Sequence, residues 1–427
     1  MSQPNPIPLS SAQEAARLAV VEWYERFAAR APMGRPRAFG EPADLRPGIT
    51  GGPSQVFRLF GYAGTGKTTI AKAIASSIDT RGRSVVFAAY TGKAASVLRA
   101  KGCNATTIHG LIYRPRTVNR LVDLDIQKPV AETAAKIAET IETNNLPLRY
   151  EADVEFDLKR HALSTANVAL IVIDECSMVG RKIGQDLLSF GIPILVLGDP
   201  AQLPPIGDAG FFTSGAPDIL LTEIHRQKDG CGILDMATTV RTGGRLECRA
   251  YDESVVMPLS RREQVNPFDF DQVIVGRHAT RAAWNKRMRE QLGFTTTLPA
   301  WGDKLVCLRN DYRSNLMNGE MVVSHGVVED VDEDTFRLRC YDPAIGRHFD
   351  TLAHKHFFEG REGDLPFGET AGATVFDWGY AITGHKSQGS QWGRVLIQDE
   401  SFCFRDARAA WLYTAITRAA DHVTVLR

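Results

Sequence analysis

A glycine-rich stretch at residues 61–68 limits the folds open to this chain more than any other feature. It reads Gly-Tyr-Ala-Gly-Thr-Gly-Lys-Thr and fits the pattern G-x-x-x-x-G-K-[ST] of phosphate-binding loops. In such a loop backbone N–H groups turn inward around a polyphosphate, Lys67 reaches the β and γ phosphates, and the Thr68 hydroxyl ligates Mg²⁺. The alternative is an ordinary glycine-rich turn without this chemistry.

The loop also predicts the elements around it. The apolar segment 57–60 precedes it, and an alanine-rich helix over residues 66–79 follows, with its N-terminus facing the phosphates. A buried strand at 84–89 completes a βαβ unit and therefore a parallel sheet. We expect ATP and Mg²⁺ as cofactors, with nucleotide contacts from Gly61, Ala63, Gly64, Thr65, Gly66, Lys67, Thr68 and Thr69.

Two further apolar runs end in polar side chains suited to phosphate chemistry. Residues 168–173 predict a central parallel strand that ends in a Walker B pattern. There Asp174 is expected to hold Mg²⁺, and Glu175 to orient and deprotonate the attacking water. The strand 194–197 ends in a proline-rich loop that presents Gln202 toward the nucleotide crevice.

Length and composition set broader limits. The chain has 427 residues, too many for one hydrophobic core, which predicts about three domains. Lys plus Arg and Asp plus Glu each number 50, so a nucleic-acid partner would need a local cationic groove. The seven cysteines form no C-x-x-C pair and are interpreted as reduced thiols. With no signal-peptide pattern and no membrane-spanning run, we expect a cytoplasmic protein without a membrane partner.

Two side chains remain open to two interpretations at this stage. Residues 8–30 predict an amphipathic helix, followed by a Pro- and Gly-rich linker at 31–54. Gln13 on that helix either reads an adenine edge or is a solvated glutamine. His109 is either a satisfied structural histidine or a functional one.

Residues 111–166 break the α/β pattern. The segments 122–126 and 154–158 alternate apolar with acidic residues as strands do, and a polar helix is expected near 130–143. We therefore expect a small inserted element that projects from the first sheet.

A second α/β region begins beyond residue 220. Its expected elements are a strand at 271–275, a helix at 278–292, a strand at 395–398, a helix at 406–419 and a strand at 422–426. Residues 297–370 interrupt this region with the composition of small β structure. Their strand patterns at 303–308, 321–323 and 335–339, with the hairpin signal Asn318–Gly319, suggest a compact barrel.

The ordered set of motifs resembles the superfamily 1B DNA helicases of the RecD and Dda type. Eight motifs stand in the family's order, at 61–68, 91–95, 107–109, 174–179, 198–205, 221–227, 383–389 and 413–419. The resemblance implies an α/β fold of two RecA-like parallel-sheet P-loop NTPase domains, with ATP between them and single-stranded DNA across their top. The implied divisions are RecA-like domain 1A (1–110 and 167–220), an inserted pin (111–166), RecA-like domain 2A (221–296 and 371–427) and an inserted SH3-like domain (297–370).

The resemblance also implies residue roles. Arg226 and Arg418 match arginines that reach the γ phosphate, and Gln202 would sense that phosphate. Gly389 and Gln13 would complete the ATP site, with Gln13 matching the adenine-reading glutamine. The implied catalytic set is Lys67, Glu175, Gln202, Arg226 and Arg418, and the implied DNA contacts are Thr91, Lys93, His109, Thr383, His385, Lys386 and Ser387. Candidates for a strand-separating wedge are Tyr113, Tyr150 and Phe156.

The predicted function is therefore an ATP-dependent DNA helicase in a bacterial or phage-infected cell. It would act as a monomer on single-stranded DNA and on junctions with duplex, moving 5′ to 3′, a polarity taken from the resemblance. Replication or recombination proteins are expected partners. One alternative is a single-stranded DNA translocase or motor subunit of a recombination or nuclease complex. The non-enzyme alternative is a nucleotide-gated DNA-binding module without turnover. A small-molecule kinase would leave residues 198–227 and 381–419 without a role, and no nuclease constellation is present.

Overall fold

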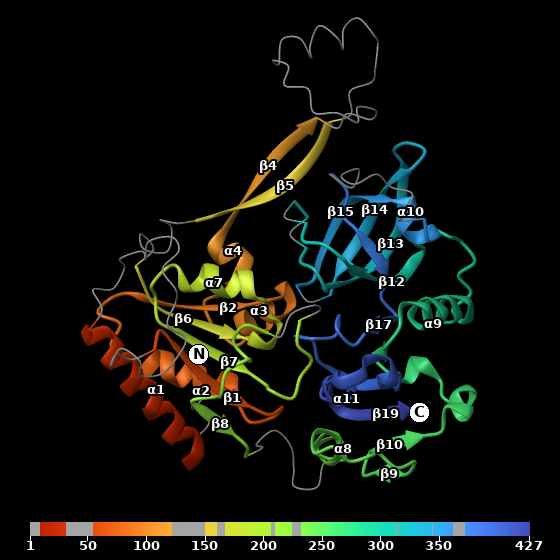
Figure 1. Cartoon of the computed structure of the whole chain (residues 1–427). Coiled ribbons are helices and arrows are strands. Elements are labelled where there is room, and N and C mark those ends of the chain that lie inside the picture. Colours follow the sequence, from red (N-terminus) through yellow and green to blue (C-terminus); the bar gives the residue numbers. More distant parts are fainter. Residues whose placement is uncertain are drawn as a thin grey trace, which may run out of the picture.

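The computed structural model describes four sheets and the helices that cover them (Figure 1). The described residues are 9–30, 54–121, 150–159, 167–205, 210–223, 232–311, 313–314, 316–343, 345–361 and 372–427. Two of the sheets are mainly parallel, the third is antiparallel, and the fourth is a two-stranded ribbon. This arrangement matches the expected α/β class with two insertions.

The first parallel sheet holds the glycine-rich loop. Its order is β3-β2-β6-β7-β1-β8, and all neighbours run parallel. The strands are β1 (Val56–Gly61), β2 (Ser84–Ala89), β3 (Ala105–Thr107), β6 (Val168–Asp174), β7 (Ile194–Gly198) and β8 (Ile219–Leu221). Because central parallel strands are covered on both faces, β6 and β7 are almost continuously apolar and buried. The predictions of strands at 84–89, 168–173 and 194–197 are confirmed.

Helices cover this sheet and fix its edges. They are α1 (Ser11–Arg30), α2 (Lys67–Ser77), α3 (Gly92–Ala100), α4 (Ile108–Ile112) and α7 (Arg181–Leu188). Helix α1 packs on α2, where Val20 and Tyr24 share a buried cluster with Ile70 and Ile74. The helices expected at 8–30 and 66–79 are therefore present, each a little shorter than predicted.

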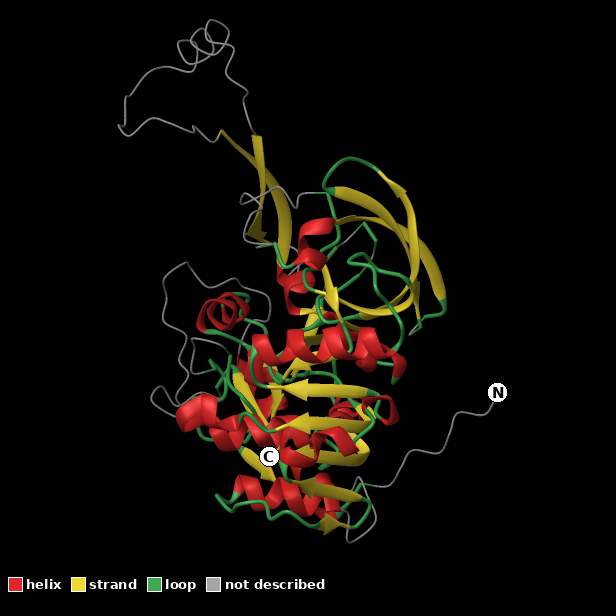
Figure 2. Cartoon of the chain, turned by 90° about the vertical axis from the view of Figure 1, so that its right-hand side faces the viewer, coloured by secondary structure: helices red, strands yellow, loops and turns green. Residues whose placement is uncertain are grey.

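The fourth sheet is the ribbon that extends away from the three other sheets (Figure 2). It pairs β4 (Tyr113–Leu121) with β5 (Tyr150–Leu158) in antiparallel register, from Tyr113 opposite Leu158 to Leu121 opposite Tyr150. The expected strand at 154–158 lies inside β5. Its partner is β4, which the pattern did not predict, because Pro115 and five polar residues interrupt any alternation there. The expected strand at 122–126 and helix at 130–143 lie outside the described residues.

The second parallel sheet has the order β17-β11-β18-β19-β10-β9. Only its edge strand runs antiparallel, where β9 pairs with β10. The strands are β9 (Ala250–Tyr251), β10 (Ser254–Met257), β11 (Gln272–Val275), β17 (Ala381–Thr383), β18 (Trp392–Gln398) and β19 (Ala419–Leu426). Three helices pack on it: α8 (Gly232–Arg241), α9 (His278–Gln291) and α11 (Arg408–Ile416).

One expected boundary in this region was wrong. The helix predicted over 406–419 begins at Arg408 and ends at Ile416, and β19 already starts at Ala419. A 3₁₀ segment, Ser401–Ala407, precedes the helix, and Arg405 within it has non-helical dihedral angles. Only Thr417 and Arg418 separate α11 from β19, so these two residues form the turn at the start of that strand.

The inserted third sheet is antiparallel, in the order β15-β14-β13-β12-β16. Its strands are β12 (Trp301–Cys307), β13 (Met321–Asp330), β14 (Thr335–Asp342), β15 (Arg347–His354) and β16 (Phe376–Trp378), and α10 (Lys355–Glu359) follows β15. Strand β16 pairs with β12 although it lies beyond the expected domain end at residue 370. The likeness to an SH3 domain stays a prediction.

The hairpin signal at Asn318–Gly319 is not a two-residue turn. Strand β12 ends at Cys307, and the two strands meet again only where Cys307 N–H donates to the Glu320 carbonyl at 2.9 Å. Gly319, with φ +90°, therefore closes a longer loop, residues 308–320. Among the described residues, every helix is too short or too polar to cross a bilayer.

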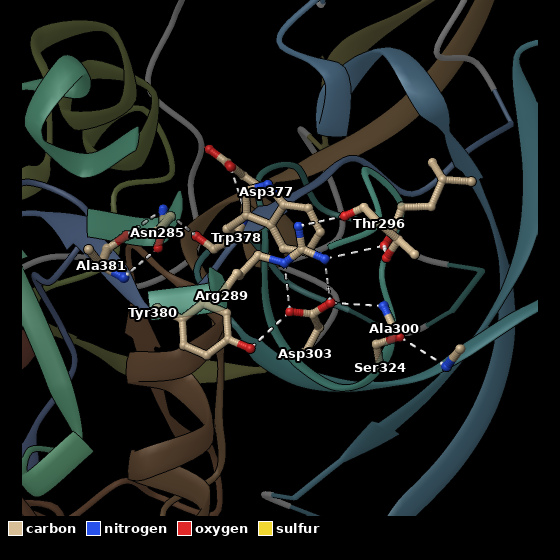
Figure 3. A network of polar contacts seen from close by, with 12 residues as sticks. Asn285, Arg289, Thr296, Ala300, Asp303, Ser324, Asp377, Trp378, Tyr380 and Ala381 are labelled. Atoms are coloured by element: carbon tan, nitrogen blue, oxygen red, sulfur yellow. Dashed lines mark hydrogen bonds and ion pairs between the residues drawn. The ribbon is translucent and has the colours of Figure 1, made fainter. Parts of the chain in front are cut away.

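A buried ion pair joins the inserted sheet to the second parallel sheet (Figure 3). Arg289 of α9 forms two hydrogen bonds to Asp303 of β12, at 2.9 and 3.0 Å. The Tyr380 hydroxyl donates to the same carboxylate at 2.9 Å, and the Arg289 guanidinium stacks on Trp378 at 3.7 Å. Because Asp303 is fully buried, this set of contacts fixes the base of the insertion.

A candidate nucleotide site between two sheets

The glycine-rich loop leaves β1 at Gly61 and enters α2 at Lys67. Gly66 caps the helix with φ 76° and without a side-chain hydrogen bond. A Cβ at this position would lie 2.6 Å from Gln13 Nε2, the movable end of a side chain, so it is the left-handed backbone that favours glycine here. A helix N-terminus without a side-chain cap is suited to an anion.

A cavity of about 870 Å³ lies in front of this loop. Its walls come from the first sheet and also from the second, more than 150 residues away. The predicted nucleotide, metal and catalytic residues that line it are Gln13, Ala63, Gly64, Thr65, Gly66, Lys67, Thr68, Thr69, Asp174, Glu175, Gln202, Gly389 and Arg418. Gly61 is buried and does not line the cavity, and Arg226 lies outside the described residues.

The two residues that carry the phosphate-loop chemistry face this cavity. Lys67 Nζ donates to the carbonyls of Gly61 at 2.6 Å and Tyr62 at 3.0 Å. The Thr68 hydroxyl donates to Asp174 Oδ2 at 3.2 Å. The hydroxyl and carboxylate oxygens expected to bind Mg²⁺ are thus adjacent, and oxygen ligands of this kind suit that ion. In the described part of the chain, no cluster of three or more His, Cys, Asp or Glu is arranged for a metal.

Glu175 occupies a strained position at the end of β6. Its backbone is left-handed, with φ 53° and ψ 45°, which is uncommon for a residue with a side chain. Burial raises the pKa of its carboxyl group, and the nearby Arg418 guanidinium opposes that rise. A carboxyl group with a raised pKa facing a phosphate site has the properties of a general base.

Gln202 and Arg418 complete the wall opposite the loop. With its amide nitrogen toward Glu175, Gln202 donates to Glu175 Oε2 at 3.2 Å and accepts from Arg418 Nη2 at 3.2 Å. Arg418 is 95% buried, and its remaining hydrogen bonds go to Thr414 O at 3.1 Å, Ser390 O at 3.2 Å and Thr417 Oγ1 at 3.3 Å. The structure therefore brings together a predicted base, a predicted sensor and a predicted arginine from both sheets.

Sequence reasoning missed the contacts that hold the two walls together. The Tyr413 hydroxyl accepts a hydrogen bond from Ala63 N–H at 3.1 Å and donates one to Asp199 Oδ2 at 2.7 Å. Nearby, Leu203 N–H donates to Thr414 Oγ1 at 2.9 Å, and Gln388 Nε2 donates to the Leu203 carbonyl at 2.8 Å. All six residues lie in motifs found in the sequence, at 61–68, 198–205, 383–389 and 413–419, so these motifs could have directed attention to the contacts.

Gln13 lines the cavity, but both ends of its amide are occupied by the protein. Its Nε2 donates to the Thr65 carbonyl at 3.0 Å, and its Oε1 accepts from Ser10 N–H at 3.0 Å. Gln13 is also 94% buried, so the interpretation as a solvated glutamine does not hold. Adenine recognition stays a prediction.

The predicted DNA contacts of the first domain cluster at α3 and α4. Thr91 caps α3 by accepting from Ala94 N–H at 3.2 Å. The Lys93 ammonium lies 4.6 Å from the Trp392 ring centre, and burial lowers its pKa. The His109 ring packs against Tyr90 and Tyr113, and burial lowers its pKa, as expected for a neutral, packed histidine.

The predicted DNA contacts of the second domain follow β17. Burial lowers the pKa of both His385 and Lys386. Ser387 is fully buried, and its hydroxyl donates to the Gly384 carbonyl at 2.7 Å. Thr383, at the end of β17, is half-buried. These four residues lie together on one segment, and their contacts with DNA stay predictions.

Of the wedge candidates, Tyr113 is buried at the base of the ribbon, where its hydroxyl donates to Asp186. A buried side chain in that position stabilises the base of the ribbon, and it is not placed to separate strands at the ribbon's tip. The side chains of Tyr150 and Phe156 lie outside the described residues.

Two protein-family models match the chain. An AAA domain covers residues 45–256, and a UvrD-like helicase C-terminal domain covers residues 379–426. The first spans the glycine-rich loop and the acidic pair, and the second spans the segment that carries Gly389 and Arg418.

Curated relatives are similar over much of the chain. The ATP-dependent RecD2 DNA helicase of Deinococcus radiodurans is 26% identical over 398 residues, which cover 85% of this chain and 46% of the relative. The helicase dda of enterobacteria phage T4 is 31% identical over 196 residues, 43% of this chain and 37% of the relative. The RecBCD enzyme subunit RecD of Mycolicibacterium smegmatis is 26% identical over 440 residues, 86% and 67% of the two chains. The chain thus spans less than half the length of the first two.

Solved structures share the fold. A structure of two Pif1 helicases at forked duplex DNA aligns with a TM-score of 0.53 and 16% identity, covering 98% of this chain and 92% of that one. Bacteroides Pif1 bound to single-stranded DNA aligns with a TM-score of 0.51, 16% identity and the same two coverages. At this identity the likeness establishes the architecture alone, and it supports the expected pair of RecA-like domains.

Proposed function

Because this chain belongs to the superfamily 1B helicases of the RecD and Dda type, we propose that it is an ATP-dependent DNA helicase. It hydrolyses ATP between two RecA-like domains and translocates on single-stranded DNA, 5′ to 3′. It displaces the complementary strand at single-strand/duplex junctions. The polarity is taken from the family.

One observation carries the proposal. Arg418 of the second domain contacts Gln202 of the first, and Gln202 contacts Glu175, so the chemistry of one site depends on both domains. An arginine that stabilises a transferring phosphoryl group is effective only when it is in place. Opening the interface would remove Arg418 from the site, which ties ATP hydrolysis to domain movement.

The chemistry of each side chain indicates its step in ATP hydrolysis. Lys67 and the N-terminus of α2 bind the phosphates. Glu175 orients the attacking water and takes a proton from it, and Gln202 senses the γ phosphate. Thr68 and Asp174 would hold Mg²⁺, which supplies charge neutralisation when bound. Arg418 stabilises negative charge as it develops, and Arg226 is proposed as a second such cation.

The domain divisions and DNA contacts set out from the sequence belong to this proposal. The two six-stranded sheets and the five-stranded sheet support these divisions. Strand β16, which the sequence divisions place in the second RecA-like domain, pairs with β12 and so belongs to the inserted domain. A monomer in the cytoplasm of a bacterial or phage-infected cell is the form we propose, in line with the bacterial and phage relatives.

Strand displacement tests the proposal. The chain is incubated with ATP and Mg²⁺ on two duplexes that differ only in carrying a 5′ or a 3′ single-stranded tail. We expect displacement from the 5′-tailed duplex and none from the other. ATP hydrolysis without stimulation by single-stranded DNA, together with no displacement from either duplex, would reject the function.

The resemblance to RecD favours one alternative, a motor subunit of a larger recombination complex, because 67% of that relative is covered. The same assay separates the two functions. Displacement by the isolated chain argues against an obligatory partner. Translocation on single strands without displacement would instead favour the subunit role.

A further inference from the structure

A cation–π contact joins the two RecA-like domains at the glycine-rich loop. The guanidinium carbon of Arg241, the last residue of α8, lies 3.7 Å from the centre of the Tyr62 ring. Tyr62 directly follows Gly61 at the start of the loop. Neither Arg241 nor Tyr62 lines the cavity in front of the loop, so this contact lies outside the set of residues assigned to ATP.

The backbone of Tyr62 helps to hold the loop in shape. Its carbonyl accepts hydrogen bonds from the Thr65 hydroxyl at 2.9 Å and from Lys67 Nζ at 3.0 Å. Both Thr65 and Lys67 line the cavity. A shift of Tyr62 would therefore be passed on to two residues that face the nucleotide.

Helix α8 fixes Arg241 in the second domain. The apolar face of this helix is buried in one cluster with α11, through Ile233, Met236, Val240 and Trp411. Arg241 itself is half-buried, and among the described residues no carboxylate pairs with its guanidinium. The cation is therefore carried by the second domain, whereas the ring that it contacts belongs to the first.

The contact of Arg241 with the loop lies close to that of Tyr413. The Tyr413 hydroxyl accepts a hydrogen bond from the N–H of Ala63, the residue after Tyr62. Burial and Asp199 raise the Tyr413 pKa, and the Arg241 guanidinium opposes that rise, so the two second-domain side chains belong to one electrostatic cluster. Ala63 also packs against the apolar cluster of α8 and α11. The second domain thus contacts two consecutive residues of the loop.

The strength of this contact depends on how the two domains lie. A guanidinium is attracted to a ring when it lies over the ring face within about 6 Å of the centre, and it loses this attraction when it moves away. Because Arg241 and Tyr62 belong to different domains, the contact forms only when the domains are close. An interaction that is made in one arrangement favours that arrangement, and any ligand whose binding depends on it binds more tightly there.

We propose that Arg241 is a positioning residue for ATP, which stacks on Tyr62 and holds the glycine-rich loop in its phosphate-binding shape when the second domain is close. Domain position is thereby coupled to nucleotide affinity. The proposal rests on the proposed function, since it needs two domains that move around one nucleotide. Its role differs from that of Arg418, which acts on the transferring phosphoryl group, because Arg241 acts through Tyr62.

The test separates nucleotide affinity from turnover in the full chain. Affinity is measured by titration with a fluorescent ATP analogue, and kcat by phosphate release at saturating ATP and single-stranded DNA. For Arg241→Ala we expect the dissociation constant to rise about three- to tenfold, as for the loss of a cation–π contact, while kcat stays within about twofold. Arg249→Ala is the matched control, because Arg249 stacks on Tyr251 at 3.9 Å within the second domain alone. It should change neither quantity.

Conservative variants distinguish the attraction between cation and ring from packing. Tyr62→Phe keeps the ring and should bind the analogue like the wild type, whereas Tyr62→Leu should match Arg241→Ala. Arg241→Lys keeps the charge and should recover part of the affinity, whereas Arg241→Met, of similar length without charge, should not. The double variant Arg241→Ala with Tyr62→Leu should lose no more than one of its single variants, because both remove the same contact.

A dissociation constant within about twofold of the wild-type value in Arg241→Ala would overturn the inference. Single losses that multiply in the double variant, or an equal loss in Arg249→Ala, would overturn it as well. The wild-type ATPase rate separates these outcomes from failure of the proposed function. If single-stranded DNA does not stimulate the unmodified chain, the function is rejected and the inference falls with it. If DNA stimulates it and Arg241→Ala binds nucleotide normally, the function stands and the role of Arg241 is rejected.

Discussion

Tyr413 donates a 2.7 Å hydrogen bond to Asp199, which joins the last helix of the second RecA-like domain to the loop after β7 of the first. The same hydroxyl accepts from Ala63 N–H in the glycine-rich loop. Burial and Asp199 raise the Tyr413 pKa, so the hydroxyl keeps its proton and remains a donor. The Tyr413 side chain of the second domain thus connects the glycine-rich loop and the loop after β7 of the first domain.

Tyr413→Phe is therefore expected to weaken the interface without changing the fold. The change leaves the buried Asp199 carboxylate and the Ala63 N–H without this partner, at a cost of about 1–3 kcal/mol. We expect kcat/KM for ATP to fall about tenfold or more, measured by phosphate release with saturating single-stranded DNA. Tyr341→Phe, on the inserted sheet, is the control, and an equal loss in both variants would contradict the role of Tyr413.

Arg418→Ala should remove catalysis while ATP still binds. The guanidinium acts on charge that develops during phosphoryl transfer, so we expect kcat to fall about a thousandfold with little change in nucleotide affinity. Arg418→Lys should not restore the rate, because an ammonium cannot reproduce the planar set of donors. Arg408→Ala, an exposed change at the start of α11, serves as the control. Nucleotide binding is measured by fluorescence titration, and normal turnover by Arg418→Ala would remove that residue from the site.

The pH profile of ATP hydrolysis reports on Glu175. Burial raises the pKa of its carboxyl group, and a general base must be ionised, so activity is present above that pKa and lost as pH falls through it. Because Arg418 lowers this pKa, Arg418→Ala should move the acid limb of its residual activity to higher pH. Glu175→Gln should abolish turnover at every pH. An acid limb that does not move in Arg418→Ala would argue against Glu175 as the titrating group.

Asp303→Ala tests the joint between the inserted sheet and the second RecA-like domain. The change leaves the 92%-buried Arg289 without its carboxylate, which for a buried pair costs about 3–5 kcal/mol. Denaturant unfolding should show this loss, and Asp350→Ala, which breaks the more exposed pair with Arg339, should show a much smaller one. Equal effects would mean that the joint is not held by this pair.

The nucleotide site was the part most open to prediction from sequence. Its residues sit in short motifs whose spacing follows from backbone geometry, as in the loop that ends at Lys67 and the acidic pair after β6. Parallel strands place their ends at one edge of a sheet, so the proximity of Asp174 and Gln202 could be expected without coordinates.

Contacts between distant segments were not predictable in the same way. The bonds of Tyr413 to Asp199 and Ala63 depend on how two domains pack, and no local pattern encodes that distance. Strand β4 lacks a clear alternation of apolar and polar residues. Its pairing with β5, and not its own sequence pattern, makes it a strand. The hairpin signal at Asn318–Gly319 lies in the connection between β12 and β13, but that connection is longer than a two-residue turn.

We propose that ATP hydrolysis at the glycine-rich loop is driven by binding of a single strand to both domains. The direct measurement is the ATPase rate with and without a single-stranded oligonucleotide, for the wild-type chain and for Lys67→Ala. We expect strong stimulation of the wild type and no hydrolysis above background in the variant, with or without DNA. Equal rates in the two proteins would contradict it.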